Sequence, residues 1–193
     1  MQLLRLLQDV TLAASNAAST TALLESAIER VCKHTGWVIG HVWRLEPASH
    51  DLVPLNVWYL RDPERHAAFV DATMRMRVGF GKGMVGHVVQ QQRPIWWSDL
   101  ARRREFGRRE VAAAVGVHTG IAFPLRGASG VVAVLEFFSH EALEPDSEFL
   151  EVMATIGVQL GHVFERRRAD EMFRGLLESA PDAMVIAGRD GRI

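Results

Sequence analysis

The chain has 193 residues, of which 48% are hydrophobic and 23% are charged, a composition typical of one ordinary globular domain with some additional length. A formal net charge of -1 and a pI near 6.7 exclude a global field that would attract nucleic acid or an anionic membrane. No segment approaches the ~20 apolar residues of a membrane span, and the single cysteine, Cys32, excludes an intramolecular disulfide framework. We therefore expect a cytoplasmic protein without nucleic-acid or membrane contact.

The first half of the chain predicts two helices, a hairpin and a third helix. Apolar residues at helical spacing indicate an amphipathic helix within residues 1–17 and a second helix that starts after the hydroxyl side chains at 19–21 and stops at Gly36. Segments 37–46 and 52–60 are rich in β-branched and aromatic residues and flank a turn, which is typical of two antiparallel strands. A polar, Ala-containing stretch at 63–76 is compatible with a helix.

In the second half, glycines at 79–86 precede an expected short helix at 84–92 and a brief strand at 95–97. An Arg-rich segment follows, and then strands at 118–125 and 131–139 joined by a turn at 126–130. Pro145 can open the last helix, whose apolar stripe is interrupted by charges at 165–171 and then resumes. A continuous helix of roughly thirty residues favours a connector or coiled coil, so we expect it to pair with a copy of itself.

The order of these elements resembles the GAF domain family over about residues 20–165. The segment GFGKGMVGHVVQQQRPIWWSDL (79–100) is similar to the family's Gly-rich turn, short helix and short strand, and GVHTGIAFPLRGASGVVAVLEFFS (116–139) is similar to its closing hairpin. The resemblance implies an α+β fold: an antiparallel sheet of five or six strands, with long terminal helices on one face. The Gly-rich segment and an Arg-rich helix would cover the other face.

After the charged interruption, FRGLLESAPDAMVIAGRDGRI (173–193) is similar to the start of a PAS domain. We therefore divide the chain into an N-terminal amphipathic helix (1–17), a GAF sensory domain (18–165), a helical linker (166–180) and a truncated PAS start (181–193).

In the GAF family, the space between the sheet and its cover binds cyclic nucleotides, tetrapyrroles, haem or small anions. The resemblance therefore implies a ligand-binding cavity here, and five residues are candidates to line it. These are His87, Trp97, Asp99, Phe106 and His118.

Each candidate also has a structural explanation. Strand alternation turns one of Trp96 and Trp97 inward. Asp99 matches an Asp that some tetrapyrrole-binding relatives keep near the chromophore, but a helix cap is the preferred interpretation. His87 and His118 could reach the cavity or serve as haem ligands, although a histidine is more often satisfied within the fold or on the surface. No metal-ligand spacing is present among the histidines.

Other residues narrow the chemistry. Cys32 is expected to be a small buried hydrophobe, and no cysteine lies where a covalent bilin would attach. Relatives that reduce methionine sulfoxide use several cysteines, so an enzyme of that kind is not expected. The arginines of segment 102–109 form a solvated face in the preferred interpretation, and in the alternative one arginine turns inward to bind an anion. Cyclic-nucleotide members carry Asn-Lys-Phe-Asp where this chain has Ser139-His140-Glu141.

The sequence therefore predicts a regulatory sensor of an unidentified small molecule, with haem or another cofactor left open. It would dimerise through its first and last helices and signal to a PAS domain and a downstream effector. A histidine kinase is the first choice for that effector, and a diguanylate cyclase is the second. The alternative is a ligand-free dimerisation module whose pocket is filled by its own Trp and Phe side chains. No catalytic constellation is recognisable.

Overall fold

The middle layer of the protein is a five-stranded antiparallel sheet with the strand order β2-β1-β5-β4-β3. The computed structural model describes residues 2–179, so the expected PAS start at 181–193 lies outside the described residues. The strands are β1 (Ile39–Leu45), β2 (Leu52–Leu60), β3 (Ile95–Trp97), β4 (Thr119–Gly127) and β5 (Gly130–Ser139). The predicted α+β fold class is confirmed, with five strands.

One expected boundary is wrong. The turn predicted at 126–130 is shorter, because Arg126 pairs with Val131 and Gly127 with Gly130, so both strands continue into it. Gly130 has a φ of 114°, a conformation open to glycine and strained for other residues. This glycine lets the hairpin close within a tight turn.

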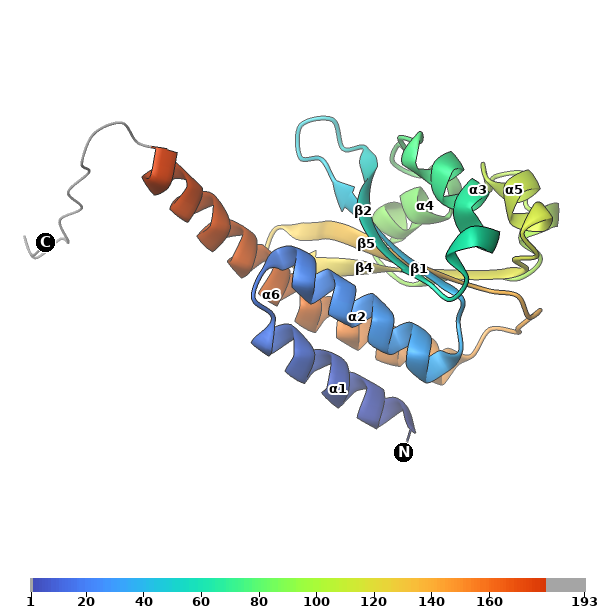
Figure 1. The fold of residues 1–193 in the computed structure, drawn as a ribbon, viewed down its shortest axis with the longest axis horizontal. Coiled ribbons are helices and arrows are strands. Elements are labelled where there is room, and N and C mark those ends of the chain that lie inside the picture. The colour runs from blue at the N-terminus through green and yellow to red at the C-terminus, as the bar shows by residue number, and fades with distance from the viewer. Residues whose placement is uncertain (1, 180–193) are drawn as a thin grey trace, which may run out of the picture.

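On one face of the sheet lie α2 (Thr20–Thr35) and α6 (Ser147–Ser179), and α1 (Gln2–Asn16) packs against these two helices on the side away from the strands (Figure 1). The predicted signals at both ends of α2 are confirmed. The Ser19 hydroxyl accepts a hydrogen bond from the Ala22 amide at 3.1 Å, and Gly36 ends the helix with a φ of 78°. Cys32 is buried against this core, as expected.

Helix α6 lies unusually close to β4 because two of its glycines face that strand. A methyl group on Gly157 would collide with the carbonyl oxygen of Pro124, and one on Gly161 with that of Arg126. Further along the helix, the Glu165 carboxylate accepts hydrogen bonds from the Ala128 amide at 2.7 Å and the Ser129 hydroxyl at 3.0 Å. The first half of α6 is therefore fixed to the sheet.

The other face carries α3 (Pro63–Met74), α4 (Gly83–Gln91), a 3₁₀ turn η1 (Leu100–Arg102) and α5 (Arg109–Ala114), which we call the cover (Figure 1). The helix expected between β3 and the closing hairpin is present as α5, and the rest of the Arg-rich segment forms η1 and a loop. The segment divides into η1 and α5 because Phe106 and Arg108 turn inward between them while Arg103 stays exposed. Over residues 2–179, no helix combines the length and the apolar character that crossing a membrane requires.

Candidate functional site

A buried ion pair joins the cover to the sheet. Arg108, which precedes α5, is 4% exposed at its side chain, and Glu136 in β5 is fully buried. The guanidinium donates to both carboxylate oxygens, from Nη1 at 2.8 Å and from Nη2 at 2.6 Å, and Nη1 also donates to the Thr73 hydroxyl in α3 at 2.8 Å. Such a bidentate pair fixes orientation as well as distance. It holds α3, the segment before α5, and β5 together.

Aromatic rings surround the guanidinium of Arg108. Its central carbon lies 4.8 Å from the ring centre of Phe69, 5.0 Å from Phe106, 5.3 Å from Phe138 and 5.5 Å from Trp43. A cation within about 6 Å of ring faces is stabilised by their quadrupoles. These four rings and the ion pair occupy the centre of the space between the sheet and the cover, where the family resemblance placed a cavity.

Glu136 stays ionised in this apolar setting. Burial by itself would raise the pKa of its carboxyl group, but the charge of Arg108 and the hydrogen bonds from His41 and Arg108 outweigh burial and lower the pKa to about 2. The anion and the Arg108 cation therefore neutralise each other within the core.

His41 in β1 extends the network to the strand next to β5. Its Nδ1 is 3.1 Å from Glu136 Oε1, and its Nε2 is 2.9 Å from the carbonyl oxygen of Leu55. Burial lowers the pKa of His41 despite the neighbouring carboxylate. Both ring nitrogens face oxygen atoms, so which oxygen receives the ring N–H depends on the tautomer. The ring stacks on Trp58 at 3.8 Å between centres.

Two hydrogen-bond donors beside His41 have no protein partner. The indole Nε1 atoms of Trp43 and Trp58 are buried and without an acceptor among the described residues. An unpaired buried donor costs about 1–3 kcal/mol, so such groups are rare unless an acceptor from water or a ligand reaches them. Both rings belong to the cover-side core.

The structure brings together three of the five predicted site residues. Trp97 and Phe106 are buried under the cover with ring centres 6.3 Å apart, and the ring of His87 lies 5.9 Å from Trp97. His87 is half-buried, and its Nδ1 donates to the carbonyl oxygen of Gly83 at 2.6 Å. Strand alternation holds as predicted, since Trp97 packs in the cover-side core and Trp96 in the helix-side core. A ligand-binding role for these three residues stays a prediction.

The other two candidates lie elsewhere. His118 is exposed to solvent and not enclosed under the cover. Asp99 is half-exposed and pairs with Arg102 at 3.1 Å, and it makes no capping hydrogen bond, so the preferred cap interpretation was wrong. The cause is a left-handed backbone at Asp99, with a φ of 51°, which differs from the extended conformation of a typical N-cap.

Arg108 was singled out from the sequence within the Arg-rich segment, but its partner Glu136 was not, although a signal was present. Glu136 is the one charged residue in the otherwise apolar strand VVAVLEFFS. Because carboxylates are almost never fully buried without a partner, this position indicated an inward-facing cation. The Arg-rich segment supplies it: Arg108 turns inward and pairs with Glu136, while Arg102, Arg103 and Arg104 are exposed, as the preferred solvated-face interpretation expects. An arginine that binds an external anion stays a prediction.

Two further features bear on binding. A pocket of about 350 Å³ opens at the end of the cover between Phe80, Val89 and Val131. At the opposite end, the Nε2 atoms of His66 and His140 lie 3.1 Å apart. Within residues 2–179, however, no group of three or more His, Cys, Asp or Glu side chains is arranged to hold a metal ion.

The model of the family described as "GAF domain" matches residues 17–165 of the chain. No curated protein sequence matches the chain.

Solved structures share its fold at low sequence identity. The GAF domain of a phosphoenolpyruvate-protein phosphotransferase from Acinetobacter has a TM-score of 0.70 at 13% identity, covering 89% of this chain and 98% of its own. The corresponding domain from Coxiella burnetii has a TM-score of 0.69 at 17% identity, covering 92% and 98%. Free methionine-R-sulfoxide reductase from Neisseria meningitidis, solved with its substrate, has a TM-score of 0.70 at 15% identity, covering 87% and 91%.

Proposed function

The chain belongs to the GAF domain family, a family of regulatory sensory domains, and on that premise we propose that it detects a small molecule and transmits the event along α6. The observation that carries this proposal is the course of α6, which spans 33 residues. Its first half is fixed to β4, and its second half continues past the sheet (Figure 1). A shift of the sheet would therefore move the second half of α6, because the helix is continuous.

The exposed apolar side chains support pairing of two copies through α1 and α6. Eight large apolar side chains are exposed among the described residues, and six of them lie on these two helices. They are Leu4, Leu12, Val158, Met172, Phe173 and Leu177. Phe173 and Leu177 are four residues apart, so they share one side of α6, the spacing at which a helix presents apolar side chains to a partner. We infer a homodimer in which the projecting ends of α6 form a coiled coil.

Sedimentation velocity tests this dimer with a matched pair of variants. Phe173→Glu places a charge on the projecting end of α6 and should shift the protein from dimer to monomer. Phe80→Glu changes an equally exposed ring on the cover and should leave the dimer unchanged. A monomeric wild-type protein, or equal effects of the two variants, would contradict the proposal.

One observation supports a ligand under the cover: the indole N–H groups of Trp43 and Trp58 are buried without a protein acceptor among the described residues. A small molecule with acceptor oxygen atoms would satisfy the indoles. Native mass spectrometry and an absorption spectrum through the visible range of freshly purified protein test for it. Trp43→Phe removes one donor and should lower occupancy, whereas retention of full occupancy would contradict this assignment.

One observation favours the ligand-free dimerisation module as a second candidate. Trp43, Phe69, Phe106, Phe138 and Arg108 already fill the centre of the space under the cover. In that case, mass spectrometry detects no released small molecule and the dimer persists, so the same measurements separate the two functions.

We further propose that the chain has no enzymatic activity of its own. It signals to a PAS domain and a downstream effector, for which a histidine kinase is the first choice and a diguanylate cyclase the second. The support against catalysis is Cys32, because burial raises the pKa of its thiol far above the usual range and keeps the thiolate unavailable. The support for the PAS domain is that the sequence from Phe173 onward is similar to the start of a PAS domain. This segment begins in the part of α6 that continues past the sheet. Autophosphorylation of a longer protein that includes the effector would support the histidine kinase, and its absence would contradict that first choice.

A further inference from the structure

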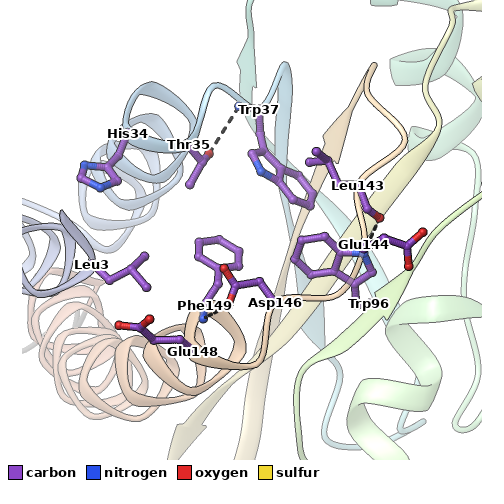
Figure 2. A pocket seen from close by; sticks show the side chains of 10 residues that line it. All are labelled: Leu3, His34, Thr35, Trp37, Trp96, Leu143, Glu144, Asp146, Glu148 and Phe149. Carbon is purple, nitrogen blue, oxygen red and sulfur yellow. Dashed lines mark hydrogen bonds between the residues drawn. The ribbon is translucent and has the colours of Figure 1, made fainter. Parts of the chain in front are cut away.

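An open pocket of about 660 Å³ lies on the helical side of the sheet, opposite the cover. Figure 2 shows the side chains that line it, which come from α1, the end of α2 and the residues after it, β3, the segment between β5 and α6, and the start of α6. It is distinct from the space around Arg108, because its aromatic residues pack in the helix-side core and those around Arg108 in the cover-side core. The size is in the range of small-molecule sites.

Three aromatic rings form the floor of this pocket. The ring centres of Trp37 and Trp96 are 5.5 Å apart, those of Trp96 and Phe149 are 6.1 Å apart, and those of Trp37 and Phe149 are 6.3 Å apart. The rings contact one another, so a ligand would lie against the cluster and not between its members. The Trp96 ring is held in place, since its Nε1 donates to the carbonyl oxygen of Leu143 at 3.2 Å.

The rim of the pocket is acidic. Glu144, Asp146 and Glu148 line it, and none of the described lining residues is Lys or Arg. The Asp146 carboxylate already accepts the Phe149 amide at 3.1 Å and so matches the positive end of α6. Glu144 and Glu148 are both exposed, and no hydrogen bond or ion pair to either side chain is found among the described residues. The rim therefore carries two carboxylates without protein partners among the described residues, one on either side of the aromatic cluster (Figure 2).

We propose that this pocket binds a small organic cation, an amine or quaternary ammonium compound with an apolar body. Aromatic faces attract such cations through their quadrupoles, and the glutamates supply the opposite charge, whereas an anion would be repelled. The ligand would contact the first turn of α6 through Phe149 and Glu148, and thus the element that leaves the domain. This link to signalling rests on the proposed function, but binding of the cation does not.

Choline is the probe, and its uncharged carbon isostere dimethylbutanol is the control ligand. Tryptophan fluorescence and calorimetry of the intact chain should show choline binding at least about tenfold more tightly than dimethylbutanol, a preference within the range of a desolvated cation–π contact. Absence of choline binding in the millimolar range, or equal binding of the two compounds, would overturn the proposal.

Charge reversal on the rim tests the location. The double variant Glu144→Lys, Glu148→Lys should weaken choline binding by at least about tenfold, since repulsion replaces attraction. Glu151→Lys changes an exposed acidic residue of the same helix outside the pocket and should bind choline like the wild type. Equal loss in both variants would place the cation elsewhere and overturn the assignment.

The outcome is separable from that of the proposed function. Choline binding by a protein that sediments as a monomer would support this site and contradict the proposed dimer. A dimer that binds no choline would do the reverse.

Discussion

Replacing Glu136 by Gln tests the buried ion pair most directly. The substitution keeps the shape of the side chain and an oxygen that can accept a hydrogen bond, but it removes the charge that neutralises Arg108. Both side chains are within the core, at 4% and 0% exposure. Arg108 would then be a buried cation with no counter-ion, stabilised by the rings around it and by the Thr73 hydroxyl.

Removing one partner of a buried pair costs about 3–5 kcal/mol, a large part of the roughly 5–15 kcal/mol that stabilises an ordinary domain. Because Gln retains one acceptor, we expect a loss of about 3 kcal/mol. For a domain of this size, that corresponds to a fall of about 6–12 °C in Tm.

Urea unfolding followed by tryptophan fluorescence measures the loss, with an unchanged denaturant slope as the check for two-state behaviour. The double variant Arg108→Met, Glu136→Gln removes both charges and should be more stable than the sum of the single effects predicts. Glu46→Gln alters a solvent-exposed pair with Arg77 and should have a much smaller effect. A loss below about 1 kcal/mol for Glu136→Gln, or strict additivity in the double variant, would refute the reasoning.

Three further predictions concern other parts of the fold. Gly157→Ala should lower the free energy of unfolding by about 1–3 kcal/mol because its methyl group meets the Pro124 carbonyl. Gly175→Ala, which adds a methyl group in open space on the same helix, should be neutral or stabilising by up to about 1 kcal/mol. Equal urea midpoints for the two variants would contradict the close contact of α6 with β4. The pKa of Glu136 is lowered to about 2 from an ordinary value of 4.5, so its contribution to the free energy of unfolding is present above pH 4.5 and is lost as the pH falls toward 2. The loss amounts to roughly 3 kcal/mol. Glu136→Gln should therefore flatten the dependence of stability on pH, measured by urea unfolding, in that window. Cys32 should resist a thiol reagent in the native protein and react fully in urea, as it is buried and the pKa of its thiol is raised; rapid native labelling would contradict its place in the core.

The local signals of the chain predicted most of the elements because each signal acts over a few residues. Helix α2 begins after Ser19, whose hydroxyl accepts a hydrogen bond, and ends at Gly36, whose backbone adopts a positive φ. The alternation at Trp96 and Trp97 follows from strand geometry alone. The long terminal helix was equally readable, since its apolar stripe repeats along one segment. The family's fold followed from the order of these elements.

Only the tertiary structure decided which charged and aromatic side chains meet. His41 and Glu136 are direct partners in the register of β1 and β5, whereas Arg108 and Thr73 reach Glu136 and each other only through the way the cover is placed on the sheet. The same placement left Asp99 and His118 outside the site, although their sequence context suggested otherwise. A hydrogen bond or ion pair depends on separations of about 3 Å, which residue types and spacing do not specify for groups that are distant along the chain. The sequence by itself therefore determined the elements and their order, and the packing of the cover decided the chemistry between them.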